Sequence, residues 1–370
     1  MNHEKKIPLI RLAKRDGMEG WKVWCIRCGS ILFALLLGAL VMGLAGANPV
    51  TAYGTMISGA LGKKSAIRQT VKIAVPLLGC ALAIAPCFKM RFWNIGGEGQ
   101  FIMGAFWAGF AAMKLGDSLP QPAMVLVMAL CGAAGGGLYG VFVAALKVRF
   151  GTNETLLTLM LNYVALYFLQ FFAETKTDWN FFLDPASARP KFAKFPESAQ
   201  MMTVPAGPLN LNLSLVAAIA ICVILYIYLN YTKRGYEIAV VGDSPNTARY
   251  AGMKVGRIVI RTIFLSAALI GLAGAFHVSS AGILSASPTN DVGWTGIVVA
   301  WLAKLNTAGI VAASLLITVL QFGCQAASAT YPSIDANFAN LLQGVILFIV
   351  LAADFFTRFR LVRTRKEGAK

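Results

Sequence analysis

One stretch between two apolar segments combines residue types that could do chemistry inside a membrane. From Arg91 to Phe106 the chain reads RFWNIGGEGQFIMGAF. A carboxylate at membrane depth, such as that of Glu98, costs at least about 2.5 kcal/mol unless it finds partners. The glycines around it allow the backbone to unwind, which exposes N–H groups that must be satisfied locally. The residues of interest are Asn94, Gly96, Gly97, Glu98, Gly99 and Gln100.

Two interpretations of this stretch remain open. In the first, a helix breaks here and the next begins at Gln100, so that a half-helix N-terminus points at a polar cavity on a translocation path. In the second, the stretch is a tight turn in which Glu98 caps the helix that follows it.

A second polar segment, GTNETLLTLMLNYVALY, runs from Gly151 to Tyr167. Thr152 or Asn153 is suited to cap a helix that carries Glu154 in its first turn. Asn162 and Tyr163 then place an amide and a phenol in an otherwise apolar helix. Asn162 either joins neighbouring helices by hydrogen bonds or contacts a transported solute.

The third segment is the polar stretch RGYEIAVVGDSPNTARYAGMKVGR. Ser244 as N-cap, Pro245 at the first position and Gly252 after the end predict a short helix over 246–251. A helix this short is marginal alone, so we expect it to dock on a partner. The alternative is a passive loop.

The composition shows what kind of protein must position these segments. The chain of 370 residues is 57% hydrophobic and only 13% charged, with a mean hydropathy of +0.66. These values, with several long apolar runs, predict an all-α integral membrane protein. Its net charge of +17 is concentrated at the ends of apolar runs, as expected of membrane topology rather than nucleic-acid binding.

The apolar runs predict about ten transmembrane helices with both termini cytoplasmic. We expect a basic cytoplasmic segment over 1–24, a transmembrane domain over 25–357 and a basic cytoplasmic tail over 358–370. Within the domain, the Pro-rich segment 174–212 is expected outside and the basic segment 232–258 inside. The group Lys63, Lys64 and Arg68 falls on the wrong side of this topology, which a re-entrant segment or a shifted first helix would explain. The expected helices are 25–46, 70–88, 100–114, 123–146, 154–173, 213–231, 258–281, 292–303, 307–325 and 338–356.

No motif for covalent chemistry is present. GKKS at 62–65 lacks the upstream glycine spacing of a phosphate-binding loop, and no zinc-protease or nucleophile-elbow motif occurs. Cys25 and Cys28 form a CxxC whose only nearby further ligand is His3, so we expect no metal site. His277 is a lone histidine, expected to be packed rather than ligating. The sequence therefore predicts no enzyme, no catalytic residue and no cofactor.

The stretches FWNIGGEGQFIMGAF, TNETLLTLMLNYVALYFLQFF and GYEIAVVGDSPNTARYAGMKVGR resemble the membrane permeases of binding-protein-dependent ABC importers. The likeness is to the ribose-type family, in its nucleoside and simple-sugar branch, over about 48–356. It implies a multi-pass protein of the bacterial inner membrane. The implied partners are cytoplasmic ATPase subunits, a second and distinct permease, and an external substrate-binding lipoprotein.

The resemblance also implies residue roles. The segment 94–100 would lie on the central translocation path, with Asn153, Glu154, Asn162 and Tyr163 as further candidates. The short helix would be the coupling helix, seated in a cleft of the ATPase and formed by Ser244, Pro245, Asn246, Thr247, Ala248, Arg249, Tyr250, Ala251 and Gly252.

Two other classes of function compete with this interpretation. An ion-coupled secondary transporter would use Glu98 as its coupling site, but it needs no docking helix. An intramembrane enzyme lacks catalytic groups. The sequence leaves the solute open among nucleosides, sugars and similar polar molecules.

Overall fold

A computed structural model describes residues 10–14, 19–206, 209–332, 334 and 336–363. His3, the start of the basic segment 1–24 and the end of the tail 358–370 lie outside these ranges. The chain divides into two compact units, unit 1 (1–57 and 320–370) and unit 2 (58–319).

Unit 1 is built on two long helices that pack against each other, α1 (Gly20–Leu44) and α13 (Ala336–Arg358). The strands β1 (Ile10–Lys14) and β4 (Phe359–Arg363) pair antiparallel, with Ile10 opposite Arg363. This pairing joins backbone at the two ends of the chain, which the sequence did not predict.

A sharp bend separates α1 from α2 (Pro49–Leu61), and the two apolar helices meet at 113°. Gly46 adopts a left-handed φ of 81°, which ends α1. Asn48 then accepts the Val50 N–H at 3.0 Å, and Pro49 starts α2. The pair is a broken span or a re-entrant segment, one of the two explanations expected for Lys63, Lys64 and Arg68.

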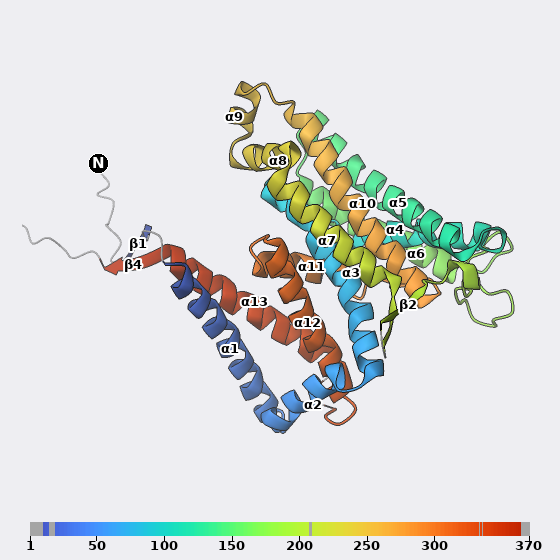
Figure 1. Ribbon diagram of the computed structural model, residues 1–370, viewed down its shortest axis with the longest axis horizontal. Coiled ribbons are helices and arrows are strands. Elements are labelled where there is room, and N and C mark those ends of the chain that lie inside the picture. The colour runs from blue at the N-terminus through green and yellow to red at the C-terminus, as the bar shows by residue number, and fades with distance from the viewer. Residues whose placement is uncertain (1–9, 15–18, 207–208, 333, 335, 364–370) are drawn as a thin grey trace, which may run out of the picture. The chain divides into compact units, whose positions relative to one another are not determined.

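Unit 2 is a bundle of long helices with shorter elements at its two ends (Figure 1). Its core consists of two clusters of buried apolar side chains. The first is contributed mainly by α3, α10, α11 and α12, and the second mainly by α4, α5, α6 and the segment 182–199. The elements are α3 (Lys64–Lys89), α4 (Gly97–Leu115), η1 (Gly116–Ser118), α5 (Gln121–Phe150), α6 (Glu154–Glu174), η2 (Glu197–Ala199), β2 (Thr203–Ala206), β3 (Leu209–Asn212), α7 (Leu213–Tyr231), α8 (Lys233–Asp243), α9 (Pro245–Tyr250), α10 (Val255–Ala281), α11 (Val292–Leu302) and α12 (Thr307–Ala327), the last of which extends into unit 1.

Helices α4, α5 and α10 cross where only small residues fit. A Cβ added to Gly132 would lie 2.6 Å from the Ala275 Cβ, and one added to Gly136 would lie 2.6 Å from the Ala267 carbonyl oxygen. This close approach is what the glycine spacing on α5 favours. The three helices form a rigid frame for the first turn of α4, because a Cβ on Gly136 would also meet the Gln100 carbonyl at 3.0 Å.

Each of the ten expected helices is present as a helix. The bounds agree within four residues except at the starts of α1 and α3, which lie five and six residues before the predicted ones. Six described helices are long and apolar enough to cross a membrane, or seven if α1 and α2 form one bent span. The six do not include α4, whose first turn is polar, or α11, which has 11 residues. The architecture is thus a polytopic helical bundle, as predicted.

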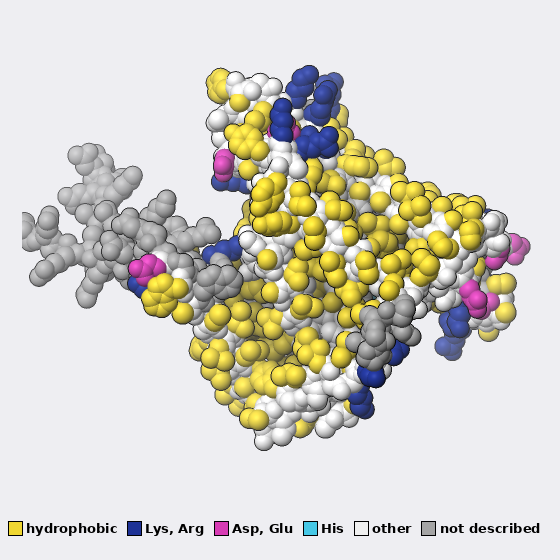
Figure 2. Space-filling model, viewed as in Figure 1, with side chains coloured by type: hydrophobic (Ala, Val, Ile, Leu, Met, Phe, Trp, Pro, Cys, Tyr) yellow, Lys and Arg dark blue, Asp and Glu magenta, His cyan; other side chains and the backbone are white. Residues whose placement is uncertain are grey.

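The two ends of unit 2 differ in character. One end, called here the α9 end, carries the last turns of α3 and α5, the start of α6, and α8 and α9. The other, the β2–β3 end, carries 175–206, 209–212 and the end of α10, where the Phe195 backbone N–H donates to the Gly282 carbonyl at 2.9 Å. Lys and Arg side chains gather at the α9 end, while hydrophobic side chains cover the helices beside it (Figure 2).

Candidate functional site

The first turns of α4 and α11 meet inside unit 2. A Cβ on Gly293 would lie 2.7 Å from the Gly97 carbonyl carbon, so the two backbones approach this closely only because residue 293 is a glycine. The Glu98 carboxylate Oε1 accepts the backbone N–H groups of Gly293 at 3.0 Å and Trp294 at 3.3 Å. A side chain of α4 therefore caps the N-terminus of α11, where a negative charge is favoured.

This geometry differs from both interpretations of the sequence in one respect. Glu98 is buried and caps a different helix rather than its own, while the N-cap of α4, Gly96, has no side-chain cap. The sequence gives no local signal for this contact, because Glu98 and Gly293 are 195 residues apart.

A pair of amides fixes the turn that leads into α4. The Asn94 Nδ2 donates to the Gln100 Oε1 at 3.1 Å, and the Gln100 Nε2 donates back to the Asn94 Oδ1 at 3.0 Å. The Asn94 Oδ1 also accepts the Gly96 N–H at 3.1 Å. Both side chains are buried, so these bonds replace the ones that water would otherwise make.

Helix α6 completes the network. The Asn162 Oδ1 accepts the Gly99 N–H at 2.8 Å, and its Nδ2 donates to the Ile95 carbonyl at 2.9 Å. One turn earlier, the Thr158 Oγ1 accepts the Ile95 N–H at 3.2 Å. Asn162 thus joins two segments, as the helix-joining alternative requires. Thr158 was missed, although it lies four residues before Asn162 on the same helix face.

The network lies well inside the bundle. Asn162 follows the start of α6 by about 12 Å of helix, and Gly140, beside Gln100, precedes the end of α5 by about 15 Å. Helix α11 is about 16 Å long, half of what a bilayer core needs. It runs beside α3 toward the α9 end, with Gly296 against Cys80 and Trp301 against Phe88. Two helix N-termini therefore converge at mid-depth, an arrangement used for solute sites in transporters.

The remaining predicted path residues lie elsewhere. Asn153 is the N-cap of α6 and accepts the Thr155 and Leu156 N–H groups. Glu154 forms an ion pair with Lys147, with 2.7 Å between Oε2 and Nζ. Tyr163 is 50% exposed and makes none of the network's bonds. Of these residues, the structure brings only Asn162 to the turn of 94–100.

The predicted short helix is present as α9. The Ser244 Oγ accepts the Thr247 N–H at 3.2 Å, and Gly252 has the left-handed φ of 75° expected after a helix end. Ala248 is buried, whereas Tyr250 is 94% exposed. The helix thus turns one small residue toward the bundle and an aromatic ring outward.

Helix α8, which precedes α9, was not predicted. Thr232 caps it by accepting the Gly235 N–H at 3.2 Å, and its Ile238 and Val241 side chains are buried. A Cβ on Gly242 would collide with the Lys89 carbonyl, so α8 packs directly on the end of α3. The spacing of Ile238 and Val241 after a capping threonine was a usable signal.

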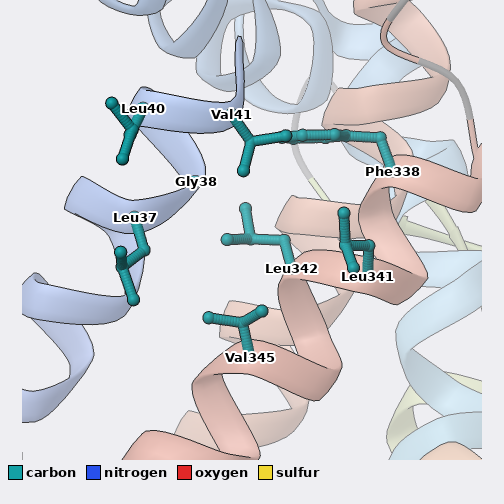
Figure 3. Close-up of a pocket in the computed structure, with 8 residues that line it drawn as sticks. All are labelled: Leu37, Gly38, Leu40, Val41, Phe338, Leu341, Leu342 and Val345. Atoms are coloured by element: carbon teal, nitrogen blue, oxygen red, sulfur yellow. The ribbon is translucent and has the colours of Figure 1, made fainter. Parts of the chain in front are cut away.

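A pocket in unit 1 lies between α1 and α13 (Figure 3). It has a volume of about 220 Å³ and is lined by apolar residues, Leu37, Gly38, Leu40, Val41, Phe338, Leu341, Leu342 and Val345. Because its lining has no hydrogen-bonding side chain, it does not suit a polar solute.

These features define a polytopic membrane permease. They are the helical bundle, the two helix N-termini at mid-depth, and α9, whose Tyr250 points away from the bundle. Residues 66–351 match the family described as the branched-chain amino acid transport system / permease component, and the chain belongs to this family.

Similar proteins are permeases of ABC transporters. The chain is 30% identical to the nucleoside ABC transporter permease protein NupB of Lactococcus lactis, over 92% of this chain and 96% of that protein. It is 29% identical to the guanosine ABC transporter permease protein NupP of Bacillus subtilis, over 92% and 96%. It is 26% identical to the glucose ABC transporter permease protein TsgB13 of Haloferax volcanii, over 95% and 93%.

The chain is therefore a multi-pass cell-membrane protein and the permease subunit of an ABC transporter, a transport component rather than an enzyme. Such a permease works with an ATPase and a substrate-binding protein. The ion-coupled alternative finds no support in these relatives.

Proposed function

We propose that this chain carries a nucleoside or a simple sugar inward by alternating access, with α9 as the coupling helix of a separate ATPase. The observation that carries the proposal is that α9 is held in place on the bundle with one side exposed. Its two ends are capped by Ser244 and Gly252, Ala248 holds it to the bundle, and Tyr250 faces outward. A helix of six residues fixed in this way can transmit a movement of its partner to α8 and α10.

The proposal places the α9 end in the cytoplasm and the predicted external loop, 174–212, outside. The α9 end carries Lys233, Arg234, Arg249, Lys254 and Arg257, which the positive-inside rule assigns to the cytoplasm.

The α4–α11 junction is proposed as the middle of the path. Two helix N-termini offer partial positive charge there, partly offset by Glu98. The names of the relatives favour a nucleoside over a sugar as the solute, since NupB and NupP are named as nucleoside and guanosine permeases.

The partner permease is proposed to be a distinct chain. Helix α6 leaves Met160, Tyr163, Val164 and Tyr167 at least half exposed, an apolar face that suits either lipid or a second permease. Two differently tagged copies of this chain should fail to co-purify; recovery of both tags together would show a homodimer.

The coupling role is tested by replacing Arg249 and Tyr250 with Asp in the assembled transporter. If Arg249 and Tyr250 are hot spots of the interface, their loss costs about 2 kcal/mol, so ATPase recovery on the purified permease should fall about 30-fold. The matched control replaces Lys233 and Arg234, exposed on neighbouring α8, with Asp. Equal ATPase recovery from both variants would refute the assignment of α9.

The solute is tested separately, by measuring uptake of labelled guanosine and labelled glucose into vesicles that contain the complete transporter. We expect saturable, ATP-dependent uptake of guanosine. Transport of glucose alone would be consistent with the coupling mechanism but would refute the assignment of a nucleoside as the solute.

A further inference from the structure

A cavity of about 740 Å³ opens at the α9 end of unit 2, behind the coupling helix. Its walls come from the turn after α3, the end of α5, the starts of α6 and α10, the C-terminal part of α8, and α9. The charged residues that line it are Arg91, Lys147, Glu154, Arg249, Lys254 and Arg257.

The cavity has more cations than its own acid can neutralise. Glu154 is its single acidic residue and is paired with Lys147 at 2.7 Å. Among the residues that the structure describes, Arg91, Lys254 and Arg257 form no ion pair, and Arg249 only donates to the Asn246 amide oxygen at 3.4 Å.

The first turn of α10 adds to this positive potential. Val255, Gly256 and Arg257 of that turn line the cavity. The N-cap, Lys254, makes no side-chain cap, and the turn contains no acidic residue. A helix of 27 residues thus presents an uncapped N-terminus to the same space as the cations.

The cavity is also partly apolar. Phe92, Val148, Val255 and Val259 line it beside the cations. Lys147 lies in the last turn of α5, where a long apolar run ends. The cavity therefore lies where a membrane surface meets the cytoplasmic segment, with cationic and apolar walls in contact.

We propose that this cavity binds a phosphate group, supplied by the headgroup of an anionic phospholipid of the adjacent leaflet. Basic pockets between transmembrane helices on the cytoplasmic side bind anionic headgroups, and the apolar wall suits the glycerol and first acyl carbons. A free phosphate would satisfy the cations but would leave that wall uncovered. The site goes beyond solute transport and does not depend on which solute is carried.

The test measures lipid retained by the full-length chain, purified from bilayers that contain equal amounts of phosphatidylglycerol and phosphatidylcholine. The variant replaces Lys254 and Arg257 with Gln. Each cation near a membrane surface contributes about fivefold to headgroup affinity, so retention of phosphatidylglycerol should weaken about 25-fold. The control replaces Lys233 and Arg234 with Gln, which removes the same charge from α8 and should leave retention unchanged.

A second variant is expected to gain lipid retention, a result that loss of folding cannot produce. Glu154→Gln frees Lys147 and removes the one acid of the cavity, so phosphatidylglycerol retention should rise about fivefold. Equal loss of the lipid from the Lys254/Arg257 and Lys233/Arg234 variants, or no gain with Glu154→Gln, would overturn the site.

A further arm separates the two sources of phosphate. Titration with inorganic phosphate should displace little phosphatidylglycerol from the wild-type chain. If inorganic phosphate binds with the same dependence on Lys254 and Arg257 while lipid retention does not depend on them, the lipid source is refuted and a soluble anion takes its place.

Discussion

At the junction of α4 and α11, the Glu98 carboxylate accepts two backbone N–H groups. Beside α9, by contrast, several cations line a cavity whose one acidic residue, Glu154, is already paired with Lys147. The junction is buried, and its amides bond to one another or to backbone. The cavity is open, and its Arg91, Lys254 and Arg257 form no ion pair with a described residue. The difference separates polar residues that hold the bundle together from polar residues that are available to a partner.

The comparison limits what the junction can offer a solute. The amide groups of Asn94, Gln100 and Asn162 already bond to protein, so a solute would have to displace these bonds to use them. For the proposed path through this junction, the bonds favour weak binding of the solute.

The largest expected effect comes from Gly293→Ala. The new Cβ would lie 2.7 Å from the Gly97 carbonyl carbon and 2.9 Å from the Glu98 Cα, and backbone atoms have little room to yield. We expect a loss of about 3 kcal/mol and a lower yield of folded protein. Gly344→Ala, where a Cβ meets nothing within 4 Å, is the control in a thermal unfolding series in detergent.

Glu98→Ala should come next. It leaves the Gly293 and Trp294 N–H groups buried without an acceptor, at a cost of about 2 kcal/mol. Glu98→Gln keeps an acceptor oxygen and should cost about half as much. Equal thermal midpoints for the wild type and Glu98→Ala would show that Glu98 is not held as a cap.

Asn162→Ala should cost about 1.5 kcal/mol, because hydrogen bonds between membrane helices are individually modest. It removes the bonds to Gly99 and Ile95. Tyr163→Phe, the neighbouring substitution outside the network, should leave the melting temperature unchanged. A larger effect of Tyr163→Phe on uptake than on melting would place Tyr163 on the solute path.

The smallest expected effect on stability comes from a substitution near the cavity. Asn153→Ala removes the N-cap of α6 and should cost about 1 kcal/mol. Melting should change slightly and lipid retention should not, since Asn153 does not line the cavity. A loss of lipid retention would extend the site to the start of α6.

Features set by local sequence were predictable. Long apolar runs placed the ten helices. Ser244, Pro245 and Gly252 placed α9, because caps act within one turn. Features set by distant contacts were not. No pattern near Glu98 points to Gly293, and none near Arg91 or Lys147 indicates that the chain brings them to Lys254 and Arg257. The pairing of β1 with β4 was missed for the same reason.

The 195-residue separation of Glu98 from Gly293 has a consequence for biosynthesis. Ribosomes add about 5–20 residues per second, so α4 emerges roughly 10–40 s before its capping partner exists. During that interval the Glu98 carboxyl group lacks the partner that lets it stay in the bilayer interior. We therefore expect the first turn of the nascent α4 to stay in contact with water, inside the insertion machinery or at the membrane surface, until α11 has been synthesised.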